Sequence, residues 1–594
     1  MSLSGEYFQP MRMILLAACC AALSAQIPDV DSRNTAIPTT DTHFTARAYG
    51  SVEEWESRKD DLRRQILFAA GLLPAREKTA LNARIFGRIE REGYSVEKVL
   101  LETLPGYYLG GNLYRPEGDG PFPAILKPHG HWAYGRLENQ PLNSTQTLAA
   151  NLARLGLVVL AYDMVGYNDT AQTPHRFTSR EMQLWNFNPL GLQLWNSIRV
   201  VDFLESLPEV DRSRIGATGA SGGATQVFLL TAVDERIAVS APVNMVSAIM
   251  QGGCVCENAP GLRIGTYNVE IAGMTAPRPQ LLVAATGDWT KNVPKEEFPA
   301  LREFYALYGT PELVEAVQFD APHNYHRESR TAVYRFLAKR LLGRDDAGAI
   351  EEEETPIEQP PGLLALYGSS LPENSAGFEQ VFAQWKRGAR RQALATRNLA
   401  ELRLNLNLAL KTVWPDAVTH ETSGERIVLS RAGVGDRVSG LWRPGQGVPA
   451  LIVHSGGASA ALDTEAARER IEAGRPVLLI DAFQTGPAAA PRDRSHEHFL
   501  TFNLSDDAAR VQDIITALAF LKQERRGPVE LAGLEDAAVW AVFAGAVAPT
   551  AVDLDVDLTG FRGADEDFLS RFFVPGIQRA GGLEAALRLT GGRH

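Results

Sequence analysis

The sequence predicts a mainly parallel α/β sheet covered by helices on both faces, followed by a second, smaller α/β unit. Three observations support this fold class. Six short apolar runs between residues 122 and 318 alternate with helical stretches, which is typical of strands buried on both faces. A serine flanked by glycines follows the third run. The order of strand-like segments then recurs in weaker form after residue 361.

The composition is that of a folded protein with an acidic surface. The chain has 594 residues, of which 45% are hydrophobic and 22% are charged, and its net charge is −12. These values exclude collagen-like, coiled-coil and fully disordered proteins. The negative charge and the lack of a long basic run argue against nucleic-acid or anionic membrane partners, so neutral or cationic substrates fit better.

An apolar stretch near the N-terminus follows Arg12 and ends in small residues at positions 22–25. This pattern predicts a signal peptide over residues 1–25 and a secreted or periplasmic protein. The stretch is too short to span a bilayer. Two alternatives are a buried N-terminal helix and a lipoprotein cleavage box that ends at Cys19.

Cleavage would leave two cysteines, Cys254 and Cys256, and therefore no disulfide framework. A bridge between residues only two positions apart would be short and strained. We expect two free thiols and no catalytic cysteine. A disulfide is the alternative in an oxidising compartment.

The first half begins with an amphipathic helix over residues 52–72 and antiparallel strands up to residue 116. The six strands of the alternating region are predicted at residues 122–126, 157–161, 214–218, 237–240, 280–284 and 314–318. We assign residues 45–343 to one catalytic domain. Residues 344–361 are rich in acidic residues and proline, a charge run that cannot bury itself, which predicts a linker; a solvated helix face is the alternative.

Residues 362–594 repeat the first half at several points. Tyr114-Arg115-Pro116 corresponds to Trp442-Arg443-Pro444, and Gly219-Ala220-Ser221 corresponds to Gly533-Leu534-Glu535. Glu535 thus stands where the first half has a serine, and only 59 residues follow it in the 594-residue chain. That length cannot hold all the remaining strands and loops with their helices. We predict a truncated, degenerate, non-catalytic domain that covers apolar surface, shapes the cleft or mediates assembly, including assembly of a homo-oligomer.

The segment Gly219-Ala220-Ser221-Gly222-Gly223 lies between a predicted strand and a helical stretch over residues 224–232. A G-x-S-x-G turn in this position exposes a serine hydroxyl above the sheet, and the helix N-terminus adds positive potential. Small neighbours are needed because the turn is tight. Ser221 is therefore the candidate nucleophile, and a structural glycine-rich turn is the alternative.

A serine hydroxyl needs a base, and the base needs a carboxylate that fixes its tautomer. Asp288 follows the fifth strand of the alternating region, and His323 follows the sixth. Ser, Asp and His in this order, each after a separate strand, is the order of the α/β-hydrolase fold. The alternatives are a turn aspartate, a surface histidine, and His326 as the base.

The tetrahedral intermediate of ester cleavage needs two backbone N–H donors. We assign one to Gly222, which follows the candidate nucleophile, and the other to His131 in the loop over residues 127–132. The alternative treats His129 and His131 as a pair of metal ligands. No third ligand stands at a diagnostic spacing, so we predict no metal and no other cofactor.

Four tryptophans belong to segments beside these motifs: Trp132, Trp185, Trp195 and Trp289. We expect Trp132, Trp185 and Trp289 to line the cleft and bind substrate, where a sugar-stacking wall would form. Core packing is the alternative for each of them.

These motifs resemble the secreted α/β-hydrolase esterases related to acetyl xylan esterases and dienelactone hydrolases. The resemblance covers about residues 45–343. It rests on His129-Gly130-His131-Trp132, Asp163-Met164-Val165-Gly166-Tyr167, Gly219-Ala220-Ser221-Gly222-Gly223, Gly252-Gly253-Cys254-Val255-Cys256-Glu257-Asn258, Gly287-Asp288-Trp289-Thr290 and His323-Asn324-Tyr325. It implies a metal-free serine esterase, often encoded among plant-polysaccharide-degrading functions, and leaves the ester open.

We therefore expect a serine carboxylic ester hydrolase that acts on acetyl or similar esters of plant cell-wall carbohydrate through an acyl-enzyme. A serine peptidase or amidase of the same fold is the alternative. A metal-dependent hydrolase and a non-catalytic binding protein fit the sequence less well.

Overall fold

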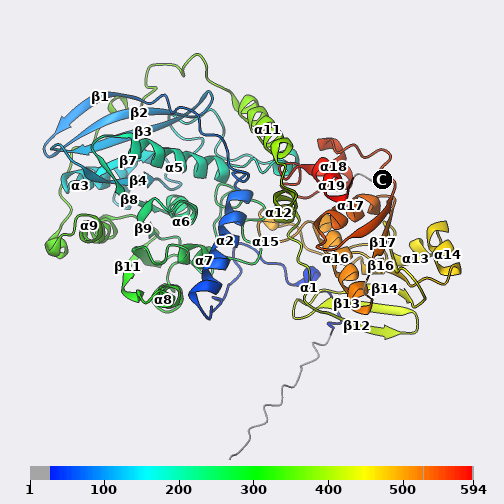
Figure 1. The fold of residues 1–594 in the computed structure, drawn as a ribbon. Helices are drawn as coiled ribbons and strands as arrows, with labels where there is room; N and C mark the ends of the chain where they lie inside the picture. Colours follow the sequence, from blue (N-terminus) through cyan, green and yellow to red (C-terminus); the bar gives the residue numbers. More distant parts are fainter. Residues whose placement is uncertain (1–26, 526, 592–594) are drawn as a thin grey trace, which may run out of the picture.

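The computed structural model describes residues 27–525 and 527–591, which form two lobes, each built on its own β-sheet (Figure 1). The predicted signal peptide lies outside these residues. Within them, no helix combines the length and apolar character needed to cross a bilayer.

The first lobe is built on a nine-stranded sheet in the order β1-β2-β3-β7-β4-β8-β9-β10-β11. Neighbouring strands are antiparallel from β1 to β7 and parallel from β7 to β11. All six strands predicted for the alternating region are present. The strands are β1 (Arg84–Arg91), β2 (Tyr94–Leu104), β3 (Tyr107–Pro116), β4 (Phe122–Pro128), β7 (Val158–Tyr162), β8 (Val210–Ala220), β9 (Ile237–Val243), β10 (Gln280–Gly287) and β11 (Val314–Pro322), with a separate ribbon of β5 (Asn139–Gln140) and β6 (Asn143–Ser144).

Helices cover both faces of this sheet because successive apolar side chains of its strands point to opposite sides. Ile125 and Val159 pack with residues of α3 and α9, whereas Leu126 and Leu160 pack with residues of α2, α5 and α6. The helices of this lobe are α2 (Val52–Ala69), α3 (Thr145–Arg154), α4 (Arg180–Leu184), α5 (Pro189–Ser206), α6 (Gly222–Val233), α7 (Asn268–Gly273), α8 (Glu297–Leu307) and α9 (Arg327–Leu341).

The second lobe is built on a seven-stranded sheet in the order β12-β13-β14-β16-β15-β17-β18. Its strand order and directions repeat those of β1 to β9 in the first lobe. Counterparts of β10 and β11 are absent from the described part of this lobe, and the sheet ends at β18. The strands are β12 (Val418–Ser423), β13 (Arg426–Arg431), β14 (Val438–Arg443), β15 (Ala450–His454), β16 (Val477–Asp481), β17 (Val529–Leu534) and β18 (Val552–Val556).

Helices α11 and α12 lie between the two sheets, and the others surround the second one (Figure 1). They are α11 (Phe378–Ala395), α12 (Leu399–Leu410), α13 (Ala458–Leu462), α14 (Glu465–Glu472), α15 (Phe499–Phe502), α16 (Asp506–Glu524), α17 (Ala537–Val547), α18 (Asp565–Arg571) and α19 (Gly582–Thr590).

The acidic, proline-rich segment between the lobes lies along the first lobe rather than in solvent. Glu352 is buried and accepts hydrogen bonds from Arg330 at 2.5 and 2.6 Å and from the Tyr334 hydroxyl at 2.8 Å. The expectation that this charge run cannot bury itself is wrong for Glu352, because a buried arginine supplies the opposite charge. The short helix α10 (Pro360–Leu363) ends the segment with Leu363 in the core.

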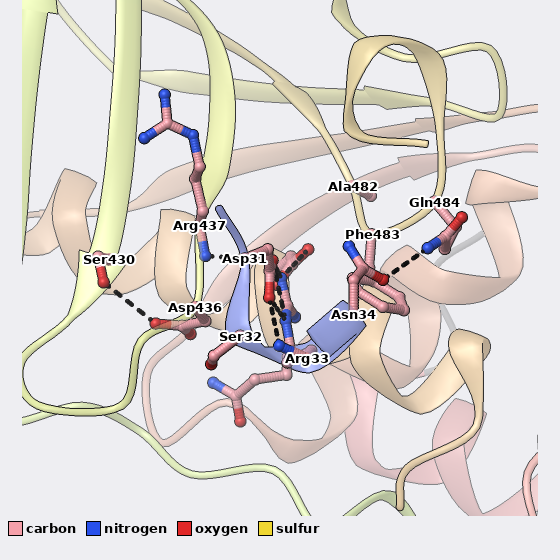
Figure 2. A network of polar contacts seen from close by, with 12 residues as sticks. Asp31, Ser32, Arg33, Asn34, Ser430, Asp436, Arg437, Ala482, Phe483 and Gln484 are labelled. Atoms are coloured by element: carbon pink, nitrogen blue, oxygen red, sulfur yellow. Dashed lines mark hydrogen bonds and ion pairs between the residues drawn. The ribbon is translucent and has the colours of Figure 1, made fainter. Parts of the chain in front are cut away.

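The first residues that the structure describes pack on the second lobe. This N-terminal arm, residues 27–36, includes the short helix α1 (Ser32–Thr35), whose Arg33 is bound to Asp31 (Figure 2). Arg33 is also bound to buried Asp513. The Arg437 N–H donates to Asp31 at 3.2 Å, and the Gln484 side chain donates to Asn34 at 2.7 Å. The described part of the chain therefore runs first along the second lobe and then enters the first lobe.

One apolar core continues from the first lobe into the second. Phe187 stacks on Phe382, with ring centroids 5.1 Å apart, and contacts Trp385. From the far end of the chain, fully buried Arg579 donates to the carbonyl oxygens of Leu73 at 2.8 Å and Pro74 at 3.0 Å. The interface thus combines core-like packing with hydrogen bonds from one lobe to the backbone of the other.

Candidate active site

Ser221 lies at the turn from β8 to α6 with a φ of 58° and a ψ of −130°. A non-glycine residue at positive φ is uncommon and is the backbone state expected of a nucleophile elbow. The neighbouring glycines are needed for close packing: a Cβ at Gly223 would lie 2.6 Å from the Pro128 carbonyl oxygen. The turn therefore holds Ser221 at the carboxyl end of the central strand.

The structure brings Asp288 and His323 together after the neighbouring strands β10 and β11. Nδ1 of His323 lies 2.9 Å from Oδ2 of Asp288, whose side chain is only 2% exposed. The other carboxylate oxygen of Asp288 accepts the backbone N–H of Thr290 at 2.7 Å. Asp288 therefore accepts the Nδ1 proton of His323, and the lone pair of the ring is left on Nε2.

Nε2 of His323 is buried and has no hydrogen-bond partner among the described residues. In particular, no hydrogen bond joins it to Ser221 in this structure. Such bonds are often long before substrate binds and tighten in the complex. The free lone pair gives this buried nitrogen the ability to take a proton.

The loop that carries His323 is tied to the central strands. The Tyr325 hydroxyl lies 2.6 Å from that of Thr218, which is on β8 three residues before Ser221. Asn244, just after β9, donates to the Asn324 carbonyl oxygen at 3.0 Å. These bonds set the height of His323 relative to the β8–α6 turn.

The alternative base, His326, has a different role. It is the N-cap of α9, and its Nδ1 accepts the Ser329 N–H at 3.3 Å. Its ring packs edge-on against Phe319. His326 is therefore engaged in holding the start of a helix.

The loop after β4 passes directly over Ser221. A Cβ at Gly130 would lie 2.7 Å from the Ala220 carbonyl oxygen and 3.0 Å from the Ser221 Cβ. The ring of His131 then lies against Gly222, where an added Cβ would be 2.6 Å from the ring. Gly222 and His131, the two predicted donor residues, are thus neighbours beside Ser221.

His129 is turned away from this loop and into the core. Its Nε2 accepts the Met164 N–H at 3.0 Å, and its Nδ1 lies 2.7 Å from the Gly130 carbonyl oxygen. Burial keeps the pKa of His129 well below its usual value, so the ring is neutral. With both nitrogens occupied, His129 cannot pair with His131 as a metal ligand.

Two of the predicted tryptophans flank His323. The ring of Trp132 stacks on it with centroids 6.1 Å apart, and Trp289 lies at 4.5 Å. The prediction for Trp185 is wrong: its buried indole N–H donates to Asp565 of the second lobe at 3.1 Å, so the ring cannot stack on a sugar. Trp195 is also buried and donates to the Thr103 carbonyl oxygen.

The second lobe has a strand-to-helix turn at the place that corresponds to the Ser221 turn, also with a positive φ. Glu535, between β17 and α17, has a φ of 56°. Its carboxylate accepts a hydrogen bond from Ser455 and lies 3.8 Å from His454 Nε2. The shape of the elbow is retained, with a carboxylate in place of the hydroxyl.

A cavity of about 460 Å³ lies between the lobes. Val255 and Asn258 of the first lobe and His496, His498 and Arg510 of the second are among its lining residues. It contains none of Ser221, Asp288 or His323. The cavity therefore adjoins the loop after β9 but is separate from the candidate catalytic groups.

That same loop brings together residues that the sequence patterns did not combine. Cys254 and Cys256 lie beside His131 and beside His175, which follows β7. Their ligand atoms all lie within 4.8 Å of one another. His175 was missed because no spacing links it to the other three.

No protein-family model matches the chain. Among solved structures, methylesterase BT1017 is 32% identical to it, with a TM-score of 0.50 over 58% of this chain and 78% of that one. The chain belongs to the family of this esterase. It is thus an α/β-hydrolase and a carboxylic ester hydrolase.

The chain is also similar to a curated protein and to another solved structure. The Bacillus subtilis (strain 168) protein named "Putative hydrolase YtaP" is 28% identical over 305 residues, which is 47% of this chain and 98% of YtaP. The acetyl xylan esterase from Paenibacillus sp. R4 is 16% identical, with a TM-score of 0.35, over 50% of this chain and 98% of that one.

Proposed function

We propose that this esterase uses Ser221, His323 and Asp288 as a catalytic triad and cleaves simple esters on plant cell-wall carbohydrate. The observation that carries the proposal is the His323–Asp288 pair, which leaves a buried, unpartnered Nε2, while Ser221 stands on a strained strand-to-helix turn. A surface histidine or a structural turn would need neither feature.

The reaction follows from these positions. Ser221 Oγ attacks the acyl carbon while His323 Nε2 takes its proton, and Asp288 stabilises the imidazolium through Nδ1. The backbone N–H groups of Gly222 and His131 hold the developing oxyanion. His323 then gives the proton to the leaving alcohol, and water releases the acid from the acyl-enzyme by the same steps in reverse.

Trp132 and Trp289 support a carbohydrate substrate. Both rings pack beside His323, so an indole face is available where the sugar next to the ester would lie. The name of BT1017 supports a methyl ester as well as the acetyl ester that we expect from the sequence. The two substrates differ in which side of the ester bond carries the sugar. In a methyl ester of a uronic acid the sugar is the acyl part and methanol is released, whereas in an acetylated sugar the sugar is the alcohol part and acetate is released.

The proposal is tested with Ser221→Ala in the full chain, with Ser570→Ala as the matched control. Ser221→Ala should lose several orders of magnitude in kcat on p-nitrophenyl acetate while its melting temperature stays unchanged. Methanol release from methyl-esterified polyuronide and acetate release from acetylated xylan then assign the substrate. Near wild-type activity in Ser221→Ala, or faster cleavage of aminoacyl anilides than of esters, would contradict the proposal.

For the second lobe we propose a non-catalytic role. A carboxylate at the Glu535 turn and a sheet that ends at β18 support this role, because an acid loop and a histidine loop would follow the two further strands. Glu535→Gln should leave ester hydrolysis unchanged. If this variant loses activity while Ser221→Ala keeps it, the second lobe holds the active site.

We also propose that residues 1–25 direct secretion and are removed. The apolar stretch and its small-residue ending support this. N-terminal sequencing of protein recovered from the cell envelope or the medium should begin near residue 26. Recovery of the uncleaved chain from the cytoplasm would contradict it.

A further inference from the structure

We propose that His131, His175, Cys254 and Cys256 form a closed, four-coordinate zinc site beside the candidate active site. The four side chains come from loops after three different strands: β4, β7 and β9. In the sheet, β4 and β9 lie on either side of β8, and β7 lies next to β4. The loops that follow these strands therefore converge around the Ser221 turn. Two thiolates and two imidazoles are a donor set that favours zinc.

The distances fit a tetrahedral ion. His131 Nε2 lies 3.1 Å from Cys256 Sγ, and His175 Nε2 lies 3.5 Å from Cys254 Sγ. With zinc bonds of about 2.0 to 2.3 Å, neighbouring ligand atoms of a tetrahedron stand about 3.3 to 3.8 Å apart. These two separations lie within a few tenths of an ångström of that range, and the remaining ones, all below 4.8 Å, need to close by at most about 1 Å.

The surroundings orient the ligands. His175 Nδ1 lies 2.7 Å from the Val165 carbonyl oxygen, so its N–H points there and the lone pair of Nε2 points at Cys254. A carbonyl behind a histidine ligand is the usual way of fixing this tautomer. Both thiols are buried in a small apolar cluster with Met164 and Val255, and the Arg176 guanidinium lies 3.9 Å from Cys254 Sγ.

Two other roles for the cysteines explain less. A disulfide across Cys254-Val255-Cys256 would be strained. It would also not explain why the imidazoles of His131 and His175 each lie against a cysteine sulfur. A catalytic thiol would need access to substrate, yet Cys256 is only 2% exposed. A metal ion accounts for all four side chains at once.

The site would also act on the proposed reaction, and this part of the inference depends on the proposed function. The His131 ring lies against Gly222, and the N–H groups of these two residues are the proposed oxyanion donors. An ion that holds the ring would hold the backbone of the loop over Ser221. The zinc ion would have a structural role, because protein side chains take all four coordination positions and leave none open to substrate.

Metal analysis of the full chain tests the proposal. Protein grown with zinc and purified under reducing conditions should contain about one zinc ion per chain, and Ser221→Ala should contain the same amount. Cys254→Ser and His175→Gln should each lower this content at least tenfold, whereas the control His420→Gln, on exposed β12, should not. The activity of Ser221→Ala tests the proposed function, and the zinc content of the variants tests the zinc site. The two proposals can therefore fail separately.

Cobalt gives a readout that does not depend on how the variants fold. The wild-type chain loaded with Co²⁺ should show thiolate-to-cobalt charge-transfer absorption, and added zinc should remove it. Reduced wild-type protein that binds neither metal would overturn the proposal. So would a zinc content unchanged in Cys254→Ser, or a Cys254–Cys256 disulfide found by mass spectrometry in the protein as purified from its native compartment.

Discussion

His323 and His326 stand three residues apart, yet their surroundings assign them opposite roles. His323 faces Asp288, while His326 caps α9 through Ser329. His323→Ala should therefore remove ester hydrolysis with little change in stability. His326→Ala should keep most of the activity and lower the free energy of unfolding by about 1 kcal/mol, the usual effect of losing an N-cap.

Activity assays and urea denaturation of both variants separate these effects. Loss of activity in His326→Ala with activity retained in His323→Ala would show that the base has been assigned to the wrong residue.

Lys127, on β4 two residues before His129, makes stability depend on pH. Its side chain is 1% exposed and donates to the Thr145 hydroxyl at 2.6 Å. Burial lowers its pKa from 10.5 to about 7. Between these values the unfolded chain binds a proton that the folded chain does not, so this lysine makes the free energy of unfolding rise with pH.

The matched comparison is Lys127→Met, which removes the titrating group and keeps the length of the side chain. Below pH 7 the lysine is protonated in both states and adds no slope. From pH 7 to 10 the wild type should gain stability relative to Lys127→Met, by up to about 1.4 kcal/mol per pH unit. The control Lys295→Met changes an exposed lysine. Parallel stability curves for wild type and Lys127→Met would refute the assignment.

At the scale of elements, a buried ion pair and several backbone hydrogen bonds attach the segment between the lobes to the first lobe. Glu352 binds Arg330, and Arg330 also donates to the Tyr325 carbonyl oxygen at 2.7 Å, so the segment is linked to the His323 loop. Glu352→Gln leaves a buried guanidinium without its countercharge and should cost about 3 kcal/mol.

Glu353→Gln is the control, because that side chain is 71% exposed and its pair with Arg154 is worth little. Thermal melts of the two variants measure the difference. Equal melting temperatures would mean that the Glu352–Arg330 pair contributes nothing to stability.

Strands and the Ser221 turn were predictable because each depends on a few adjacent residues. The run at 214–218 and the glycines around Ser221 carry their signal locally, as do Asp288 and His323 at strand ends. Trp185 was placed wrongly because its partner, Asp565, is 380 positions away. The same holds for Glu352, whose burial depends on a partner in another element. Local patterns contain no information about such pairs.

At the scale of the whole molecule, the shared core should make the lobes unfold together. Buried residues of both lobes form one continuous apolar cluster, and Arg579 of the second lobe binds backbone carbonyls of the first. Separating the lobes would expose this apolar core to water, at a cost in free energy that grows with the exposed area. Calorimetry of the full chain should therefore show a single transition, and two resolved transitions would show that the lobes are independent.

The N-terminal arm also affects the order in which the protein is assembled. A ribosome makes Arg33 early, but its partner Asp513 lies 480 positions later. The first lobe has all its strands long before the arm has a surface to bind. Docking of the arm closes a loop that contains most of the chain, and contacts of such separation form slowly. Although they are synthesised first, these residues of the described chain are then among the last to form their native contacts. A ribosome that stalls before residue 513 leaves Arg33 of the arm without the buried carboxylate that it binds.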